Sequence, residues 1–167
     1  PLASSVLETV TINSISVANT VIDLDTSGVN TTNLVVTGDK KLTIGVAATA
    51  TSALDTDIIS VDASASTGGL TLPLAPLAAN FTVVGSAAAD SIVASSGNIN
   101  MTGGAGNDTL TAAGTWTGTD VFDGGDGKDT LAVSADFEPL NTGPTSANTI
   151  TAGLSNVEVL KVTGDSD

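Results

Sequence analysis

Two segments rich in glycine and aspartate carry the residues whose types and spacing could bind a metal ion. Residues 103–111 read GGAGNDTLT and residues 124–132 read GGDGKDTLA. Both fit the nine-residue pattern G-G-x-G-x-D-x-U-x, in which U is a large apolar residue. Glycine permits a tight turn with positive φ that directs carbonyl oxygens inward, and the aspartate adds a carboxylate. Such a set of oxygen ligands suits a hard cation such as Ca²⁺.

We call these two nine-residue segments the complete words. The candidate metal ligands lie in the complete words and beside them. Two acids at the second word, Asp123 and Asp126, are candidate outer ligands, although acids at such positions are more often solvated. The complete candidate set is Asp90, Gly103, Gly104, Gly106, Asp108, Asp120, Asp123, Gly124, Gly125, Asp126, Gly127 and Asp129.

Weaker copies of the same word precede both segments. Counting back in nines gives copies at 94–102, 85–93 and 115–123, with one interruption at 112–114. Two of them retain the aspartate, as Asp90 and Asp120. The alternative is a pair of hairpin turns, because Asp-Gly also marks a type I′ turn. The array of five nonapeptides over 85–132 is favoured because the aspartate and leucine positions match as well as the glycines.

The two complete words resemble the RTX calcium-binding repeat family. In that family two nonapeptides make one coil, so words two apart lie on the same edge. The resemblance implies that Asp90, Asp108 and Asp129 share one edge and that Ile99 and Asp120 share the other. Neighbouring coils lie ~4.8 Å apart. We therefore predict at least two calcium ions on the first edge. One lies between the words at Gly103 and Gly124, and a weaker one lies between those at Gly85 and Gly103.

Two D-x-D pairs are weaker candidates for chemistry. Asp23 pairs with Asp25, and Asp55 pairs with Asp57. Residues two apart in a strand share a face, so each pair could hold a cation or act as a carboxylate dyad. A solvated turn or edge is the favoured interpretation, because no third ligand or base lies nearby in the sequence.

Composition excludes several classes of function. The formal net charge is −14, from 18 acidic residues and four basic ones, which disfavours nucleic acid and acidic membrane surfaces as partners. The chain has no Cys and no His, so Cys/His zinc sites and Ser-His-Asp catalysis are excluded. No apolar run approaches the ~20 residues of a membrane helix, so we expect no membrane insertion. We also expect no enzyme activity.

The elements that position the words are predicted to be short strands. Apolar residues alternate at Ile15/Val17, 42–46, 70–74 and Val157/Val159, and glycine-rich turns separate them. Val36-Thr37-Gly38-Asp39 recurs as Val162-Thr163-Gly164-Asp165, and this internal similarity favours a solenoid. The predicted fold is all-β, a right-handed parallel β-helix or β-roll solenoid with calcium-binding nonapeptide turns.

The chain is expected to form one continuous domain, as a piece of a longer protein. Residues 1–84 are predicted to form strand-rich coils, and residues 85–132 the calcium-binding array. Residues 133–167 are predicted to form a loop, at 133–149, followed by terminal strands.

Beyond the RTX words, the layout resembles the RTX-type surface-layer (S-layer) proteins of Gram-negative bacteria. The resemblance rests on Thr67–Thr71, Gly103–Asp108, Gly124–Leu131, Gly153–Leu160 and Val162–Gly164. It implies type I secretion, folding in external calcium, and self-assembly into a lattice on the cell surface. The expected partners are other copies of the chain and a cell-surface glycan or lipopolysaccharide. The alternatives are a binding or spacer module of a large secreted RTX adhesin and the non-catalytic C-terminal part of a secreted RTX enzyme.

Overall fold

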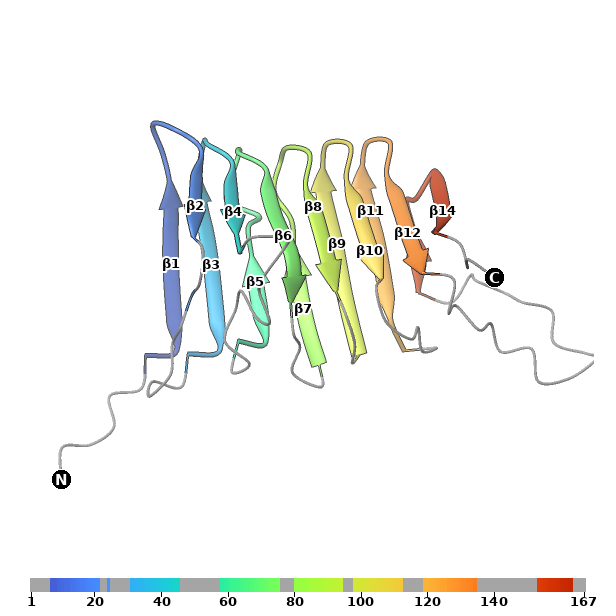
Figure 1. Cartoon of the computed structure of the whole chain (residues 1–167), viewed down its shortest axis with the longest axis horizontal. Helices are drawn as coiled ribbons and strands as arrows, with labels where there is room; N and C mark the ends of the chain where they lie inside the picture. Colours follow the sequence, from blue (N-terminus) through green and yellow to red (C-terminus); the bar gives the residue numbers. More distant parts are fainter. Residues whose placement is uncertain are drawn as a thin grey trace, which may run out of the picture.

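The described residues form two parallel β-sheets that face each other (Figure 1). The computed structural model describes residues 7–21, 24, 31–45, 58–75, 80–94, 98–112, 119–134 and 153–163. The first sheet contains, in spatial order, β1 (Thr9–Ser14), β3 (Asn33–Gly38), β5 (Ser60–Asp62), β7 (Asn80–Val84), β9 (Asn98–Ala105), β11 (Val121–Asp126) and β13 (Leu154–Ser155). The second contains β2 (Asn19–Val21), β4 (Leu42–Ile44), β6 (Leu70–Ala75), β8 (Ser91–Ala94), β10 (Thr109–Ala112), β12 (Thr130–Ser134) and β14 (Val159–Thr163).

The topology is that of a solenoid. Odd-numbered strands pair only with odd-numbered strands and even with even, always in parallel, so each coil contributes one strand to each sheet. Figure 1 shows the chain advancing along the long axis of the molecule, from β1 at one end to β14 at the other. The predicted all-β parallel solenoid is confirmed, and no α-helix occurs among the described residues. The hand of the coil stays a prediction.

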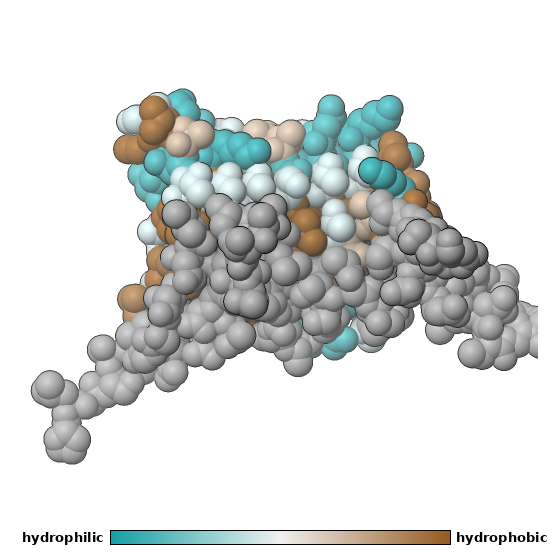
Figure 2. Space-filling view, in the orientation of Figure 1, coloured by the Kyte–Doolittle hydropathy of each residue, from teal (hydrophilic) through white to brown (hydrophobic). Residues whose placement is uncertain are grey.

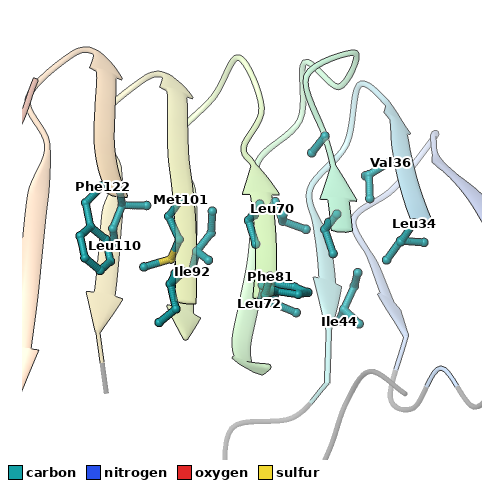
Figure 3. Close-up of a cluster of buried hydrophobic side chains, with 14 of the residues drawn as sticks. Leu34, Val36, Ile44, Leu70, Leu72, Phe81, Ile92, Met101, Leu110 and Phe122 are labelled. Carbon is teal, nitrogen blue, oxygen red and sulfur yellow. The ribbon is translucent and has the colours of Figure 1, made fainter. Parts of the chain in front are cut away.

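The core lies between the two sheets and consists of apolar side chains stacked in columns (Figure 3). One column runs through Leu72, Ile92, Leu110 and Leu131, which are paired in register from coil to coil and are completely buried. Alternate residues of each strand point inward, as the period of two in the sequence predicts. Each coil therefore covers the apolar face of the next, and a core with few aromatic residues suffices.

The same column becomes exposed at the last described coil. Leu160 continues the Leu131 position in register and is 43% exposed, and its neighbour Val162 is 58% exposed. The equivalent residues of the preceding coil, Leu131 and Val133, are buried, but no further described coil covers Leu160 and Val162. Figure 2 shows apolar surface at both ends of the described body, with a more polar surface between.

Several predicted elements differ in the structure. Ile15 and Val17 lie between β1 and β2 rather than in a strand, and both are exposed. The motif Val36–Gly38 ends β3 in one sheet, whereas Val162 and Thr163 end β14 in the other, so the two copies are not equivalent positions of the coil. A short Val-Thr-Gly motif fits the end of either strand, because it specifies only an apolar residue followed by a turn.

Other predictions fall partly or wholly outside the described residues. β12 continues through Ser134, two residues into the segment predicted to be a loop. The D-x-D pairs at Asp23/Asp25 and Asp55/Asp57 lie outside the described part of the chain. Where the structure describes the chain, it contains no helix long and apolar enough to cross a membrane. The division into 1–84, 85–132 and 133–167 stays a prediction.

Candidate metal centre

The glycine-rich words form turns at one edge of the solenoid. The turn between β9 and β10 contains Asp108, and the turn between β11 and β12 contains Asp129. The weaker word with Asp90 forms the turn between β7 and β8. These turns lie at the upper edge in Figure 1. The predicted sharing of one edge by these three aspartates is therefore confirmed.

Hydrogen bonds between coils join these aspartates into one continuous column. The backbone N–H of Asp90 donates to Asp108 Oδ1 at 2.8 Å, across a step of 18 residues. The N–H of Asp108 donates to Asp129 Oδ1 at 2.7 Å, across a step of 21 residues. The N–H of Asp129 in turn donates to Glu158 Oε2 at 2.7 Å. We call Asp90, Asp108, Asp129 and Glu158 the carboxylate column.

Glu158 is the member of this column that the sequence did not predict. It lies 29 residues from Asp129, so the nine-residue count does not reach it. The register of β12 with β14 pairs Thr130 with Val159, which places Glu158 directly beside Asp129. The only sequence signal is an acid immediately before a terminal strand.

The second carboxylate oxygen of each complete word is buried without a partner. Asp108 Oδ2 and Asp129 Oδ2 lack a hydrogen-bond donor, although Asp108 is 1% exposed and Asp129 is 0% exposed. Leaving a buried polar atom unsatisfied costs about 1–3 kcal/mol, and more when the group is charged. Two such atoms at equivalent places in adjacent coils indicate that a cation belongs beside them.

The glycines leave room for these oxygens and for close stacking of the turns. A methyl group on Gly103 would collide with Asp108 Oδ2 and with the carbonyl oxygen of Gly124. A methyl group on Gly124 would lie 2.7 Å from Asp129 Oδ2. The remaining glycines of the words have φ values that only glycine adopts readily: Gly104 107°, Gly106 119°, Gly125 91° and Gly127 149°.

Burial and neighbouring charges make the column unfavourable when it is fully ionised without a cation. Burial, together with the charges of Asp90 and Asp129, raises the pKa of Asp108 to about 6, against the lowering effect of the hydrogen bond from the Asp90 N–H. Burial also raises the pKa of Asp90, partly offset by hydrogen bonds from Leu70 and Ser86. A divalent cation would reverse the sign of this repulsion.

The turn that contains Asp90 differs from the two complete words. The backbone N–H groups of Leu70 and Ser86 donate to Asp90 Oδ1 and Oδ2, each at 2.5 Å. Ser86 Oγ lies 2.8 Å from Asp90 Oδ1. Both carboxylate oxygens of Asp90 are therefore satisfied by the protein. The calcium ion predicted between the words at Gly85 and Gly103 stays a prediction, and this geometry favours the complete words instead.

The three other acidic candidates make contacts of other kinds. Asp120 lies at the opposite edge, as predicted, and its Oδ1 accepts a hydrogen bond from the N–H of Ile99 at 2.8 Å. Asp123 Oδ1 accepts from the backbone N–H of Gly125 at 3.2 Å and from Asn156 Nδ2 at 2.8 Å. The carbonyl oxygen of Asp126, rather than its side chain, contacts the neighbouring turn, where it accepts from Gly106 at 2.8 Å. Their roles as metal ligands stay predictions.

The column fits calcium through a mixture of carboxylate and carbonyl oxygens. Within the described residues, no group of three or more Asp, Glu, His or Cys side chains could hold a metal ion by itself. Ca²⁺ accepts six to eight oxygens at 2.3–2.6 Å, and backbone carbonyls are common among them. Asp108 and Asp129, with carbonyl oxygens of the glycine turns, would supply such a site. The ion would supply positive charge between stacked carboxylates.

A comparison with protein families identifies the two words. The family model of the RTX calcium-binding nonapeptide repeat (4 copies) matches residues 82–110 and 116–135. RTX nonapeptide repeats bind Ca²⁺ and form β-rolls; such repeat modules are typically non-catalytic, and the proteins that carry them are typically secreted. No curated protein and no solved structure was found to match the chain. The cofactor predicted from the two words is therefore Ca²⁺, and the chain contains a calcium-binding structural module.

Proposed function

We propose that this chain is part of a bacterial S-layer subunit, a secreted structural protein that requires calcium and self-assembles on the cell surface. The observation that carries the calcium requirement is the pair of buried, unpartnered oxygens on Asp108 and Asp129. Both lie in a column whose members repel one another when ionised. Calcium outside the cell would convert this column from a destabilising element into a stabilising one.

The last described coil presents a surface on which the proposed self-assembly could act. In the described residues, β14 ends one sheet and carries the exposed inward-facing residues Leu160 and Val162. Fully burying one such side chain contributes about 1.5–3 kcal/mol. An exposed sheet edge beside an uncovered core position can add further strands, whether from the same chain or from another copy.

The strongly negative charge shapes the expected partners. At a net charge of −14, two copies repel each other unless cations bridge or neutralise their surfaces. Calcium would therefore favour both folding and association. A cell-surface glycan or lipopolysaccharide is the proposed anchor, with calcium between the acidic chain and the anionic sugar phosphates. We propose no catalytic role.

Electron microscopy of the purified chain in calcium and in chelator tests the proposal. We expect regular sheets or a two-dimensional lattice at millimolar calcium, and their loss in excess chelator. A monodisperse monomer in calcium, with a normal calcium-dependent fold, would contradict the S-layer role and support the module of a large RTX adhesin or the non-catalytic part of a secreted RTX enzyme. Hydrolysis by the chain in an activity screen would contradict the non-catalytic assignment.

A further inference from the structure

Asp129 belongs to the last complete word, and its unpartnered oxygen lies beside the last described coil, which has no such word. Asp129 is 0% exposed, and its Oδ2 has no hydrogen-bond partner. β11 pairs Asp123 with Ser155, so the residues that follow them, Gly124 and Asn156, also lie side by side. A methyl group placed on Gly124 would collide with the carbonyl oxygen of Asn156 and would also lie 2.7 Å from Asp129 Oδ2. The two oxygens therefore converge on the same small space.

The same arrangement occurs one coil earlier, between the two complete words. There, a methyl group on Gly103 would meet Asp108 Oδ2 and the carbonyl oxygen of Gly124. Each unpartnered carboxylate oxygen is thus matched with a carbonyl oxygen from the following coil. The first pair lies between two glycine words. The second lies between a glycine word and the turn at Asn156, which has no such word.

The turn from Asn156 to Glu158 has features that replace the missing word. Asn156 adopts a φ of 50°, a left-handed conformation that the words achieve with glycine. Its side chain is fixed by the 2.8 Å hydrogen bond from Nδ2 to Asp123 Oδ1. Glu158 takes the place of the aspartate, and its Oε2 accepts from the N–H of Asp129 at 2.7 Å. Its longer side chain compensates for a turn with fewer residues.

The turn at the other end of the array lacks the unpartnered oxygen. Asp90 Oδ2 accepts from the N–H of Ser86 at 2.5 Å, so a protein donor already takes the position that is open in Asp108 and Asp129. A cation there would have to displace that hydrogen bond. The oxygens that lack a partner are thus shifted by one coil toward the C-terminus, relative to the positions expected from the words.

We propose that a second calcium site lies between the turn at Gly124–Asp129 and the turn at Asn156–Glu158. Its ligands are Asp129 Oδ2 and the carbonyl oxygen of Asn156, with Glu158 as the second carboxylate. The charges of Asp129 and Glu158 together balance one divalent cation. The site rests on the calcium chemistry of the repeats and is independent of the S-layer role, because it concerns ion number and position rather than assembly.

Equilibrium dialysis against calcium at fixed free concentration, with the metal counted per chain, tests the site. Glu158→Gln removes the charge and retains an oxygen that can accept from the Asp129 N–H. We expect this variant to bind one calcium ion fewer per chain than the unaltered protein, or that ion at least tenfold more weakly. Glu8→Gln is the matched control, because Glu8 is exposed and lies at the other end of the solenoid. Unchanged calcium binding by Glu158→Gln would overturn the proposal.

A crystal structure of the unaltered chain grown in calcium provides the second measurement, in case Glu158→Gln fails to fold. We expect an ion in contact with Asp129 Oδ2 and the Asn156 carbonyl oxygen at calcium–oxygen distances of about 2.3–2.6 Å. An ion in the Gly85–Asp90 turn with none between Asp129 and Asn156 would overturn the proposal. Both measurements count and locate bound calcium, so they stand even if the chain does not assemble into a two-dimensional S-layer lattice.

Discussion

Replacing Asp108 by asparagine should raise stability in chelator and should remove the further stabilisation that calcium provides at this site. Asp108 lies between Asp90 and Asp129 in the carboxylate column, and its Oδ1 accepts the Asp90 N–H. An asparagine oxygen can retain that hydrogen bond, so Asp108→Asn isolates the charge from the hydrogen bond. In chelator the charge is unfavourable. The difference between the ordinary pKa of 3.8 and the value of about 6 corresponds to about 3 kcal/mol near neutral pH.

A second estimate gives the same magnitude. Two unit charges about 5 Å apart repel by about 3 kcal/mol at an effective dielectric constant of 20. For a chain of this size, 1 kcal/mol shifts the unfolding midpoint by about 2–4 °C. We therefore expect Asp108→Asn to raise the midpoint in chelator by about 6–12 °C.

In calcium the same substitution removes a ligand. A site filled at a hundred times its dissociation constant contributes about 2.7 kcal/mol. The amide group of asparagine would place N–H groups where Asp108 Oδ2 now faces the cation position. Because the substitution already gains about 3 kcal/mol in the calcium-free chain, the gain and the loss nearly cancel in calcium. We therefore expect Asp108→Asn to leave the midpoint in millimolar calcium close to that of the unaltered chain, and to reduce the rise in midpoint from chelator to calcium by about 5–11 °C.

Thermal unfolding followed by far-UV circular dichroism at pH 7.5 measures both effects. Asp62→Asn is the control, because Asp62 is exposed and the substitution removes the same charge. Asp62 Oδ1 also accepts a comparable hydrogen bond, from the backbone N–H of Ser64 at 2.9 Å. Its effect should stay within about 0.5 kcal/mol in both conditions. If Asp108→Asn lowers the midpoint equally in chelator and in calcium, the carboxylate is a structural hydrogen-bond acceptor and the charge argument is wrong.

Three further predictions follow from the same column. In chelator, the stability contributed by Asp108 should be greatest below about pH 4 and should fall as pH rises to its folded-state pKa of about 6, because over this range the unfolded chain has released a proton that the folded chain still holds. In calcium, stability should instead rise over that range, and a pH series of melts measures both trends. Ser86→Ala should destabilise the chain by about 1–3 kcal/mol equally in calcium and chelator, because Ser86 Oγ contacts Asp90 without a metal; a larger loss in calcium alone would contradict this. Gly103→Ala should weaken calcium binding at least tenfold in a titration, because its methyl group would collide with Asp108 Oδ2; wild-type affinity would contradict the assigned position.

The sequence predicted the stacking of the two complete words correctly because their spacing maps directly onto the coil. A coil of two nonapeptides requires a step of 18 residues, and the three extra residues at 112–114 enlarge the next step to 21. Leu110 and Leu131 follow their aspartates by two residues, and both are completely buried. Here a strict pattern of glycine, aspartate and leucine specifies turn, edge and core together.

The rest of the site was missed where that pattern degenerates. Glu158 lies beyond a long step and is preceded by no complete glycine word, so only the register of β14 reveals it. Ser86 occupies a glycine position of a weak word, yet its hydroxyl and N–H satisfy the carboxylate of Asp90. Ile15 and Val17 alternate like a strand, but two apolar residues are too few to distinguish a strand from an exposed bend.

The central claim is that calcium holds the stacked carboxylates of residues 85–132 together. The most direct test is the unfolding midpoint of the unaltered chain in millimolar calcium and in excess chelator, with magnesium as a control cation. Two sites at a hundredfold saturation contribute about 5 kcal/mol, which approaches the whole stability of an ordinary domain. We predict a much higher midpoint in calcium, and little effect of magnesium, which requires a smaller and more regular ligand shell. Coincident midpoints in calcium and chelator would show that the metal is not structural and would contradict the account.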